Sequence, residues 1–279
     1  MRRSLLVSLA LAAVLALVGV LPDAVAGLQS DPPEGRGPTL LALGDSIAFG
    51  WNALADARFP TDFVGYPDLV ARELGLADVN AACPGEATGG FLSPVGVDNG
   101  CRPYRLHYLL HESYQGTQMD YALAYLESHR EVRVVTIDLG VNDVFAFEHG
   151  CAAAAQPSAC LETGLPAVLR NVEGNLRTIF SRIRDEAHYR GRLVVLTYYP
   201  ITYQTQRLNG AIAAAAHSTG ATVASGPDAF AKADRSGGGS PCRAGLLMLE
   251  RPGICDIHPT LRGSELLAGV VLRAAGSPA

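Results

Sequence analysis

The order of predicted elements indicates an α/β protein with a mostly parallel sheet of about five strands. Short runs rich in Val, Ile and Leu alternate along the chain with amphipathic segments. Such alternation is typical of βα units, whose strands are parallel. No internal repeat and no change in composition marks a second domain. The 279 residues are enough for one well-buried domain of this kind.

The chain begins with an apolar leader. Arg2 and Arg3 give it a positive start, residues 5–21 are apolar, and residues 24–26 have the small side chains of a cleavage site. This pattern is typical of a signal peptide over residues 1–26, so we expect a secreted, extracellular protein. An uncleaved membrane anchor is the alternative, because the apolar run approaches spanning length. No second run in the sequence is long and apolar enough to cross a bilayer.

Five segments are predicted to be strands. Residues 27–38 are polar and rich in Pro and Gly, so we interpret them as a tail before the first strand. The strand candidates are residues 39–43, 78–82, 132–139, 192–198 and 221–224. The third and fourth are nearly continuous in Val, Ile, Leu and Tyr, as expected of parallel strands covered on both faces.

Segments with helical periodicity lie between and after these strands. The clearest is 165–188, where apolar side chains recur at the three-and-four spacing of one buried face. Shorter helices are predicted at residues 66–74, 117–129, 204–218 and 259–275. The regions 86–115 and 232–255 are long for connectors, so we expect them to contribute substrate-facing surface.

Six cysteines follow the leader: Cys83, Cys101, Cys151, Cys160, Cys242 and Cys255. An even set of cysteines in a chain with a secretory leader predicts disulfides, although sequence alone does not choose among the connectivities. Each cysteine lies in or beside a stretch rich in Gly or Pro, where a short loop closes easily. We therefore predict the neighbour pairs Cys83–Cys101, Cys151–Cys160 and Cys242–Cys255. A zinc site is disfavoured because the sequence has no C-x-x-C pair.

The formal net charge of −5 argues against a nucleic-acid partner, and no basic stripe is present to meet phosphates. A nucleotide-binding protein is also disfavoured, because no G-x-G-x-x-G or G-x-x-x-x-G-K-[ST] motif follows a predicted strand. His107 and His111 have a spacing that suits a metal, but no carboxylate completes an H-E-x-x-H motif. We predict no metal and no cofactor.

Polar segments follow the first three predicted strands. Gly44-Asp45-Ser46 follows the first, Cys83-Pro84-Gly85 the second and Gly140-Val141-Asn142-Asp143 the third. Because ligands of open α/β sheets bind outside the carboxyl ends of the strands, all three segments are expected at one edge of the sheet. A chance scatter of Ser, Gly and Asn would not place each of them directly after a strand.

Ser46 is the candidate nucleophile, on a tight strand-to-helix turn that Gly44 permits. Taken alone, an Asp-Ser pair after a strand is more typical of a helix N-cap. Gly85 can bring its backbone amide close to a forming oxyanion, and the side-chain amide of Asn142 can donate to the same oxygen. Turn or cap roles are the alternatives for these two residues.

His258 is the candidate general base. It precedes Pro259, which suits a first helical turn, so we expect His258 to open the last helix. Its imidazole would take the serine proton and pass it to the leaving group. The histidines without such support are interpreted as surface or helix-end residues: His129, His149, His188 and His217.

In this order the segments resemble the signature blocks of the SGNH or GDSL hydrolases, a superfamily of secreted esterases and lipases. The blocks are Gly44-Asp45-Ser46, Asn80 through Gly85, Gly140-Val141-Asn142-Asp143 and the segment that ends at His258. The resemblance covers residues 39–279 and implies a single-domain, three-layer α/β/α flavodoxin-like fold. It also implies a serine acyl-enzyme mechanism, with an oxyanion hole from the Ser46 amide, Gly85 and Asn142.

The chain departs from the pattern of the family at the acidic residue. The family usually places it three positions before the histidine, where this sequence has Cys255, whereas Asp256 lies two positions before. We expect Asp256 to orient the imidazole, with a backbone carbonyl as the alternative. The Gly-x-Ser-x-Gly elbow is absent around Ser46, which argues against the α/β-hydrolase fold of other lipases.

We therefore expect a secreted serine carboxylic-ester hydrolase, an esterase or lipase that acts as a monomer on a small-molecule or lipid ester. Aromatic residues near the first two blocks, such as Trp51 and Phe91, are candidates for an acyl pocket, with core packing as the alternative. A polysaccharide deacetylase on the same scaffold and a catalytically weak secreted binding module are the other readings. In the predicted pairing, two disulfides would anchor the Gly85 turn and the loop of His258.

Overall fold

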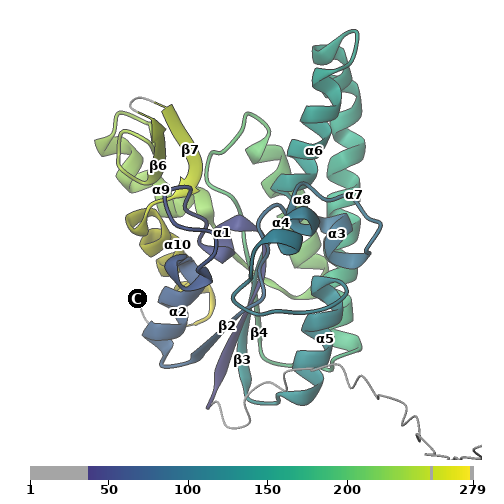
Figure 1. Cartoon of the computed structure of the whole chain (residues 1–279), viewed down its shortest axis with the longest axis vertical. Coiled ribbons are helices and arrows are strands. Elements are labelled where there is room, and N and C mark those ends of the chain that lie inside the picture. Colours follow the sequence, from purple (N-terminus) through teal and green to yellow (C-terminus); the bar gives the residue numbers. More distant parts are fainter. Residues whose placement is uncertain (1–36, 252–253, 277–279) are drawn as a thin grey trace, which may run out of the picture. The chain divides into compact units, whose positions relative to one another are not determined.

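A computed structural model describes residues 37–251 and 254–276 of the chain. Five strands form one sheet in the order β2-β1-β3-β4-β5, and every neighbouring pair is parallel (Figure 1). The strands are β1 (Thr39–Gly44), β2 (Ala77–Asn80), β3 (Val132–Asp138), β4 (Arg192–Leu196) and β5 (Thr222–Ala224). This confirms the predicted α/β fold with a mostly parallel sheet.

The predicted signal peptide (residues 1–26) and residues 27–36 of the predicted tail lie outside the described part of the chain. Gly37 and Pro38 lead directly into β1, where the carbonyl of Pro38 accepts a hydrogen bond from the amide of Ala77. Among the described residues, no helix is long and apolar enough to span a membrane.

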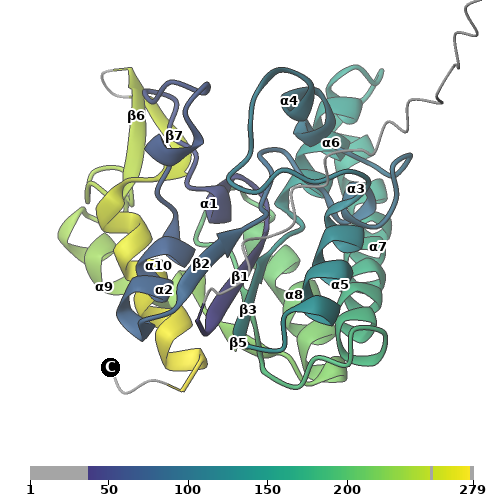
Figure 2. The same ribbon diagram turned by 60° about the horizontal axis from the view of Figure 1, so that its bottom comes forward.

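Helices cover both faces of the sheet, which gives the three-layer α/β/α arrangement (Figure 2). One face carries α2 (Tyr66–Leu74) and α10 (Leu261–Ala274), with α9 (Gly226–Ser236) packed against α10. The other face carries α5 (Gln118–Ser128), α7 (Pro157–Asp185) and α8 (Thr205–Thr219). Because both faces are covered, all six residues of β1 are buried, as expected of a central parallel strand.

Helix α7 begins eight residues before the predicted start at residue 165, at Pro157. Proline suits this first helical position, where its missing N–H has no partner to lose. The sequence pattern missed the first two turns because the apolar stripe that packs on the sheet begins only at Leu165. The earlier turns pack instead on α6 (Val141–Ala152), and the Cys151–Cys160 disulfide joins the two helices.

The region predicted as a loop over 232–255 contains part of a separate antiparallel hairpin. Its strands are β6 (Leu247–Arg251) and β7 (Ile254–Pro259). The prediction that His258 opens the last helix was wrong, because His258 lies on β7 and α10 begins at Leu261. Thr260 is the N-cap of α10, and its side chain accepts a hydrogen bond from the amide of Gly263, the role that β-hydroxyl side chains favour.

Short helices gather at the carboxyl edge of the sheet, which is the upper edge in Figure 1. They are α1 (Ser46–Phe49), η1 (Pro60–Asp62), α3 (Thr88–Leu92) and α4 (Cys101–His107). The last two lie within the long region 86–115. This edge therefore brings together the segments that the sequence singled out for chemistry.

Candidate active site

Ser46 is the first residue of α1, directly after the turn that ends β1. Gly44 has a φ of 135°, and a Cβ atom there would lie 2.3 Å from the carbonyl oxygen of Asp138. Only glycine fits this turn, because β3 approaches it so closely. The N-cap of α1 is Asp45, whose Oδ1 accepts a hydrogen bond of 2.9 Å from the amide of Ile47. The capping interpretation therefore applies to Asp45, and Ser46 is the residue that follows it.

The side chains of Ser46, His258 and Asp256 form a continuous hydrogen-bonded chain. Ser46 Oγ lies 2.9 Å from His258 Nε2, and His258 Nδ1 lies 2.8 Å from Asp256 Oδ2. The His258 and Asp256 side chains are only 13% and 11% exposed. Two segments more than 200 residues apart in sequence thus meet at one atom pair.

The carboxyl group of Asp256 is placed to stay ionised. Burial opposes ionisation, but the hydrogen bond and the charge of His258 outweigh it and lower the pKa of Asp256. The amide of Ile257 adds a hydrogen bond of 2.6 Å to Asp256 Oδ1. A carboxylate in this state holds Nδ1 protonated, which leaves Nε2 free to accept a proton from Ser46.

Tyr199 supports the strand that carries this pair. Its hydroxyl donates a hydrogen bond to the carbonyl of Ile257, the residue between Asp256 and His258. The Tyr199 ring stacks on Phe230 at a centroid distance of 4.4 Å. Tyr199 follows β4, so this contact fixes β7 against the carboxyl end of the sheet.

Gly85 and Asn142, the oxyanion-hole candidates, are linked through Asn99. The amide of Asn99 donates to the carbonyl of Gly85 at 3.0 Å, and Asn99 Nδ2 donates to Asn142 Oδ1 at 2.8 Å. Asn142 Oδ1 is engaged and its Nδ2 donates one hydrogen to Asp45 Oδ2 at 3.4 Å, which leaves the second hydrogen of Nδ2 to donate elsewhere. Among the described residues, no acceptor takes the backbone N–H of Gly85. Both groups therefore have a donor available for a ligand oxygen.

The close approach of Asn99 also explains the glycine at position 85. Gly85 has a φ of 82°, and a Cβ atom there would lie 2.7 Å from the carbonyl oxygen of Asn99. Packing of this loop, in addition to access for a substrate, thus requires glycine. The Cys83–Cys101 disulfide closes the same loop two residues away on each side.

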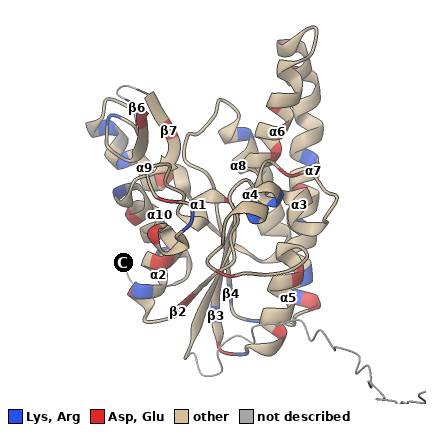
Figure 3. Cartoon of the chain, viewed as in Figure 1, with Lys and Arg blue, Asp and Glu red and all other residues tan. Residues whose placement is uncertain are grey.

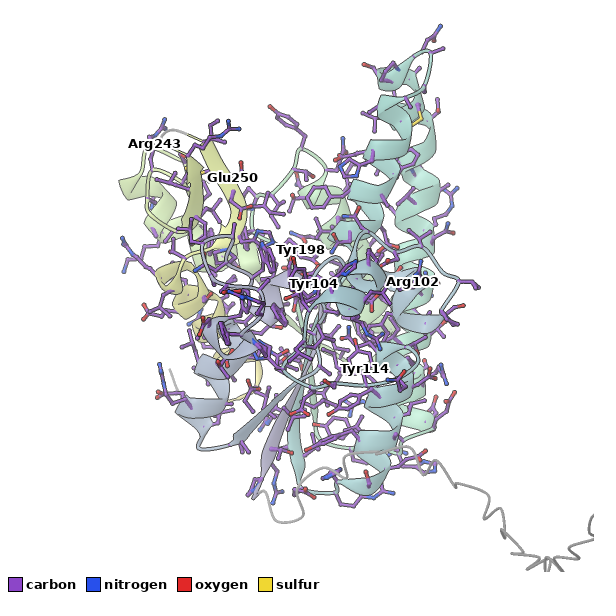
Figure 4. The ribbon with its side chains drawn as sticks, in the orientation of Figure 1. Arg102, Tyr104, Tyr114, Tyr198, Arg243 and Glu250 are labelled. Atoms are coloured by element: carbon purple, nitrogen blue, oxygen red, sulfur yellow. A yellow bond between two sulfur atoms is a disulfide. The ribbon has the colours of Figure 1, made fainter. Side chains whose placement is uncertain are left out.

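A buried carboxyl pair lies behind the Gly44 turn. Asp45 Oδ2 accepts hydrogen bonds from the Tyr198 hydroxyl at 2.7 Å and from Asn142 Nδ2 at 3.4 Å. Asp138 Oδ1 accepts from the Tyr66 hydroxyl at 3.0 Å, and the Asp45 carboxyl lies close enough to act on Asp138 electrostatically. Burial and the charge of Asp45 raise the pKa of Asp138 well above its ordinary value. Burial raises the pKa of Asp45 as well, but the hydrogen bonds from Ile47 and Tyr198 oppose that rise, so Asp138 is the member of the pair that is more readily protonated. Figure 4 shows Tyr198 at the carboxyl end of the sheet.

Gln118 clamps the turn from the other side. Its Oε1 accepts from the amide of Gly44 at 2.6 Å, and its Nε2 donates to the Gly44 carbonyl at 3.0 Å. Gln118 Nε2 also lies 3.5 Å from Glu86 Oε2. Burial and the nearby charge of Asp98 raise the pKa of Glu86 to about 8. A neutral Glu86 thus connects the Gly85 turn with the turn of Ser46.

The structure pairs all six cysteines as Cys83–Cys101, Cys151–Cys160 and Cys242–Cys255. Glu86, Asp98 and Cys101 bring potential metal ligands together, but the Cys101 sulfur is bonded to Cys83 and offers no thiolate. His107 ends α4 and His111 lies beyond it, so the two histidines do not share a helix face. His111 Nε2 instead lies 3.0 Å from the carbonyl oxygen of Phe49.

Several residues that shape the site were not found from the sequence: Asn99, Gln118, Asp138, Tyr198 and Tyr199. A carboxylate inside the otherwise apolar β3 segment was a usable signal for Asp138, because buried charges need partners. The others contact the site across the fold, and no local pattern marks them.

A serine hydrogen-bonded to a histidine–aspartate pair, at the carboxyl edge of a parallel sheet, is the arrangement of serine hydrolases. Comparison with known families gives the same class: the GDSL-like Lipase/Acylhydrolase family matches residues 42–266. The chain belongs to this family, and it is accordingly a carboxylic ester hydrolase. Among curated proteins, no significant match to the chain is found.

Solved structures share the fold at low sequence identity. A phospholipase A1 from Streptomyces albidoflavus is 21% identical with a TM-score of 0.55, covering 88% of this chain and 100% of that one. An acetylxylan esterase from Geobacillus stearothermophilus is 18% identical with a TM-score of 0.52, covering 88% of this chain and 96% of that one. These likenesses show the fold.

Proposed function

We propose that the protein is a secreted serine esterase or lipase that works through an acyl-enzyme on Ser46. The observation that carries this proposal is the unbroken hydrogen-bonded chain from Ser46 Oγ through His258 to Asp256. The packing of a helix N-terminus does not by itself require a histidine from a remote part of the sequence to lie 2.9 Å from the side chain of the first helical residue. The chemistry of an activated serine does require it.

In the first half-reaction, Ser46 Oγ attacks the ester carbonyl carbon while His258 Nε2 accepts the serine proton. The carbonyl oxygen becomes an oxyanion, which the amides of Ser46 and Gly85 and the side-chain amide of Asn142 stabilise. The tetrahedral intermediate then collapses, the bond to the leaving alkoxide breaks, and His258 gives the proton to that oxygen. An alcohol leaves and the acyl group stays on Ser46.

In the second half-reaction, water attacks the acyl carbon and His258 accepts a proton from that water. Collapse of the second intermediate returns the proton to Ser46 Oγ and releases the carboxylic acid. Asp256 stays ionised through both steps and stabilises the imidazolium, in accord with the lowered pKa of Asp256.

The surroundings of His258 favour an ester with an apolar acyl group. The Trp51 ring lies 6.3 Å from the His258 ring, stacks on Phe63 and contacts Tyr104 edge-on. An aromatic wall beside the base suits an acyl chain of short to medium length or a lipid ester. The same wall can stack on a sugar ring, so a polysaccharide deacetylase is the second candidate; an acetylxylan esterase shares the fold.

Export is part of this proposal. The leader over residues 1–26 has the pattern of a signal peptide, and three disulfides suit an oxidising compartment. Expression of the full chain in a bacterial host, followed by N-terminal sequencing of the protein outside the cells, tests both points. A protein that keeps residues 1–26 or stays with the membrane would overturn secretion.

The catalytic proposal is tested with p-nitrophenyl esters from acetate to palmitate. We expect Ser46→Ala to abolish hydrolysis, and the exposed Ser158→Ala, on the first turn of α7, to leave it unchanged. Labelling by a fluorophosphonate should follow the same pattern, since only an activated serine reacts. Activity unchanged in Ser46→Ala would overturn the mechanism. A preference for acetate alone, with release of acetate from acetylated xylan, would favour the deacetylase.

A further inference from the structure

A cavity lies at the opposite edge of the sheet from Ser46. It has a volume of about 840 Å³. Its walls are the end of α5, the first residues of β3, the segment 188–192 that leads into β4, the end of α10, and the segment 74–76 from the end of α2 to β2. These segments lie at the amino ends of the parallel strands, whereas Ser46 follows a carboxyl end. In Figure 1 the amino ends of the strands are at the bottom.

The charge of this cavity is opposite to that of the whole chain. Its lining contains six basic side chains and no Asp or Glu: His129, Arg130, Arg133, His188, Arg190 and Arg192. The chain as a whole has 27 acidic residues against 22 Lys and Arg. Elsewhere acidic and basic residues are interspersed over the helices (Figure 3). Within the described part of the chain, none of the four arginines pairs with a carboxylate within 4.0 Å.

Backbone carbonyls accept hydrogen bonds from two of the four arginines. Arg130 donates to the carbonyl of Ala187 at 3.3 Å, and Arg190 donates to the carbonyl of Arg184 at 3.2 Å. The guanidinium of Arg192 lies against the end of α10, where a Cβ atom on Gly276 would be 2.6 Å from it. The like charges are thus kept together, although they repel one another.

The floor of the cavity is apolar. Leu126, Val132 and Val134 are buried beneath the basic side chains. The four arginines are exposed, and an apolar surface beneath such charges strengthens their field and raises the local concentration of anions. Guanidinium groups donate paired hydrogen bonds to phosphate oxygens, and several such groups together suit an anion with more than one charge.

We propose that this cavity binds phosphate groups of a multiply charged ligand, supplied either by a soluble pyrophosphate or polyphosphate or by the headgroup of an anionic phospholipid. The site is separate from the ester-hydrolysing centre, because the two lie at opposite edges of the sheet. Its occupation is therefore not needed for hydrolysis of a small ester, and the proposal stands or falls independently of the proposed function.

Titration calorimetry with sodium pyrophosphate, at an ionic strength held constant with NaCl, tests the site directly. We expect binding to the wild-type protein and an affinity about tenfold or more weaker in Arg133→Gln/Arg192→Gln. Neither of these arginines donates a side-chain hydrogen bond among the described residues, so both substitutions spare the fold. Arg170→Gln on α7, an exposed arginine outside the cavity, is the matched control and should bind as the wild type does.

The thermal unfolding temperature gives a second readout. Pyrophosphate should raise it in the wild type and in Arg170→Gln but not in the double variant. At low ionic strength without the anion, the double variant should melt higher than the wild type, since like-charge repulsion is relieved. No binding by the wild type, or equal binding by the double variant, would overturn the proposal.

Vesicles separate the two sources of phosphate. Cosedimentation of the Ser46→Ala protein with phosphatidic acid vesicles, but not with phosphatidylcholine vesicles, would assign the site to an anionic headgroup. Binding of pyrophosphate without cosedimentation would assign it to a soluble phosphate. In both cases p-nitrophenyl ester hydrolysis by Arg133→Gln/Arg192→Gln should remain within about twofold of the wild type.

Discussion

Asp256 reaches His258 across an irregular stretch of strand β7. Leu247 pairs with Pro259 and Leu249 pairs with Cys255, so β7 has two more residues than β6 between these pairs. Asp256 and His258 lie in this stretch, where Asp256 Oδ2 is 2.8 Å from His258 Nδ1. The position three before the histidine is Cys255, which is bonded to Cys242, so Asp256 is the acidic residue nearest to His258 in sequence.

Replacement of Asp256 by Asn should lower kcat for ester hydrolysis by a factor on the order of a thousand or more. The amide keeps the shape but does not stabilise the imidazolium, and it favours the wrong tautomer of His258. The measurement is kcat on a p-nitrophenyl ester beside Asp228→Asn, a control in the first turn of α9. Near-normal turnover would mean that a backbone carbonyl orients the histidine.

We predict that Asn99 positions the proposed oxyanion donors. Asn99→Ala removes the hydrogen bond that fixes the Asn142 amide, so we expect kcat to fall by about tenfold with little change in KM. Asn99→Asp keeps a side-chain oxygen but loses the N–H donor, so its kcat should fall by a similar factor. The effect should vanish in an Asn142→Ala background, because Asn99 acts through Asn142. Additive losses in the double variant would contradict this role.

The Cys242–Cys255 disulfide should matter more for activity than Cys151–Cys160 does. The first joins β7 directly before Asp256, whereas the second joins α6 and α7 away from Ser46, His258 and Asp256. Replacing Cys242 and Cys255 by Ser should lower kcat by about tenfold or more while the fold persists. Each disulfide stabilises the protein by about 2–4 kcal/mol.

The matched control is the protein in which Cys151 and Cys160 are replaced by Ser. It should lose comparable stability in urea unfolding while kcat stays within about twofold of the wild type, since loop lengths of this order are worth similar amounts. Equal kcat losses in the two double variants would show that the disulfides act only through global stability.

The sheet was predictable from sequence because its strands are covered on both faces. The buried residues of β3 and β4 are mostly Val, Ile and Leu, and this leaves a nearly continuous apolar run in the sequence. The hairpin β6–β7 has no such cover, and its residues are mostly exposed or half-buried. Alternation of Leu247 and Leu249, followed in sequence by Pro252-Gly253, was the available turn signal.

The groups expected to do chemistry were also predictable, because their residue types and their order form short motifs. The residues that hold these groups in place could not be predicted from the sequence. Gln118 contacts Gly44 over 74 positions in sequence, and Asn99 contacts Asn142 over 43. Such contacts depend on how helices pack at the edge of the sheet, so they leave no trace in the local sequence.

The buried carboxyl of Glu86 should make stability depend on pH. Burial and the charge of Asp98 raise the pKa of Glu86 from 4.5 to about 8 in the folded protein. Between these values the folded protein keeps a proton that the unfolded chain has lost, so stability falls as pH rises through this window. Glu86→Gln carries no such penalty, because the amide is neutral at every pH. The free energy of unfolding of Glu86→Gln, relative to that of the wild type, should therefore rise by about 3–5 kcal/mol between pH 4.5 and pH 8.

Urea unfolding of the wild type and Glu86→Gln at both ends of this window measures the difference. Burial of ionised Glu86 costs the wild type nothing below pH 4.5 and its full amount above pH 8. The difference in free energy of unfolding between the two proteins should therefore grow across this window and then level off. Glu127→Gln, an exposed position on α5, controls for the loss of one negative charge and should show a nearly constant difference. A constant difference for Glu86→Gln as well would mean that Glu86 is already ionised in the folded protein at neutral pH. Glu86 would then be a carboxylate that accepts a hydrogen bond from Gln118 Nε2. The positive charges of Arg102 and Arg105, which oppose the rise in the pKa of Glu86, would stabilise this carboxylate.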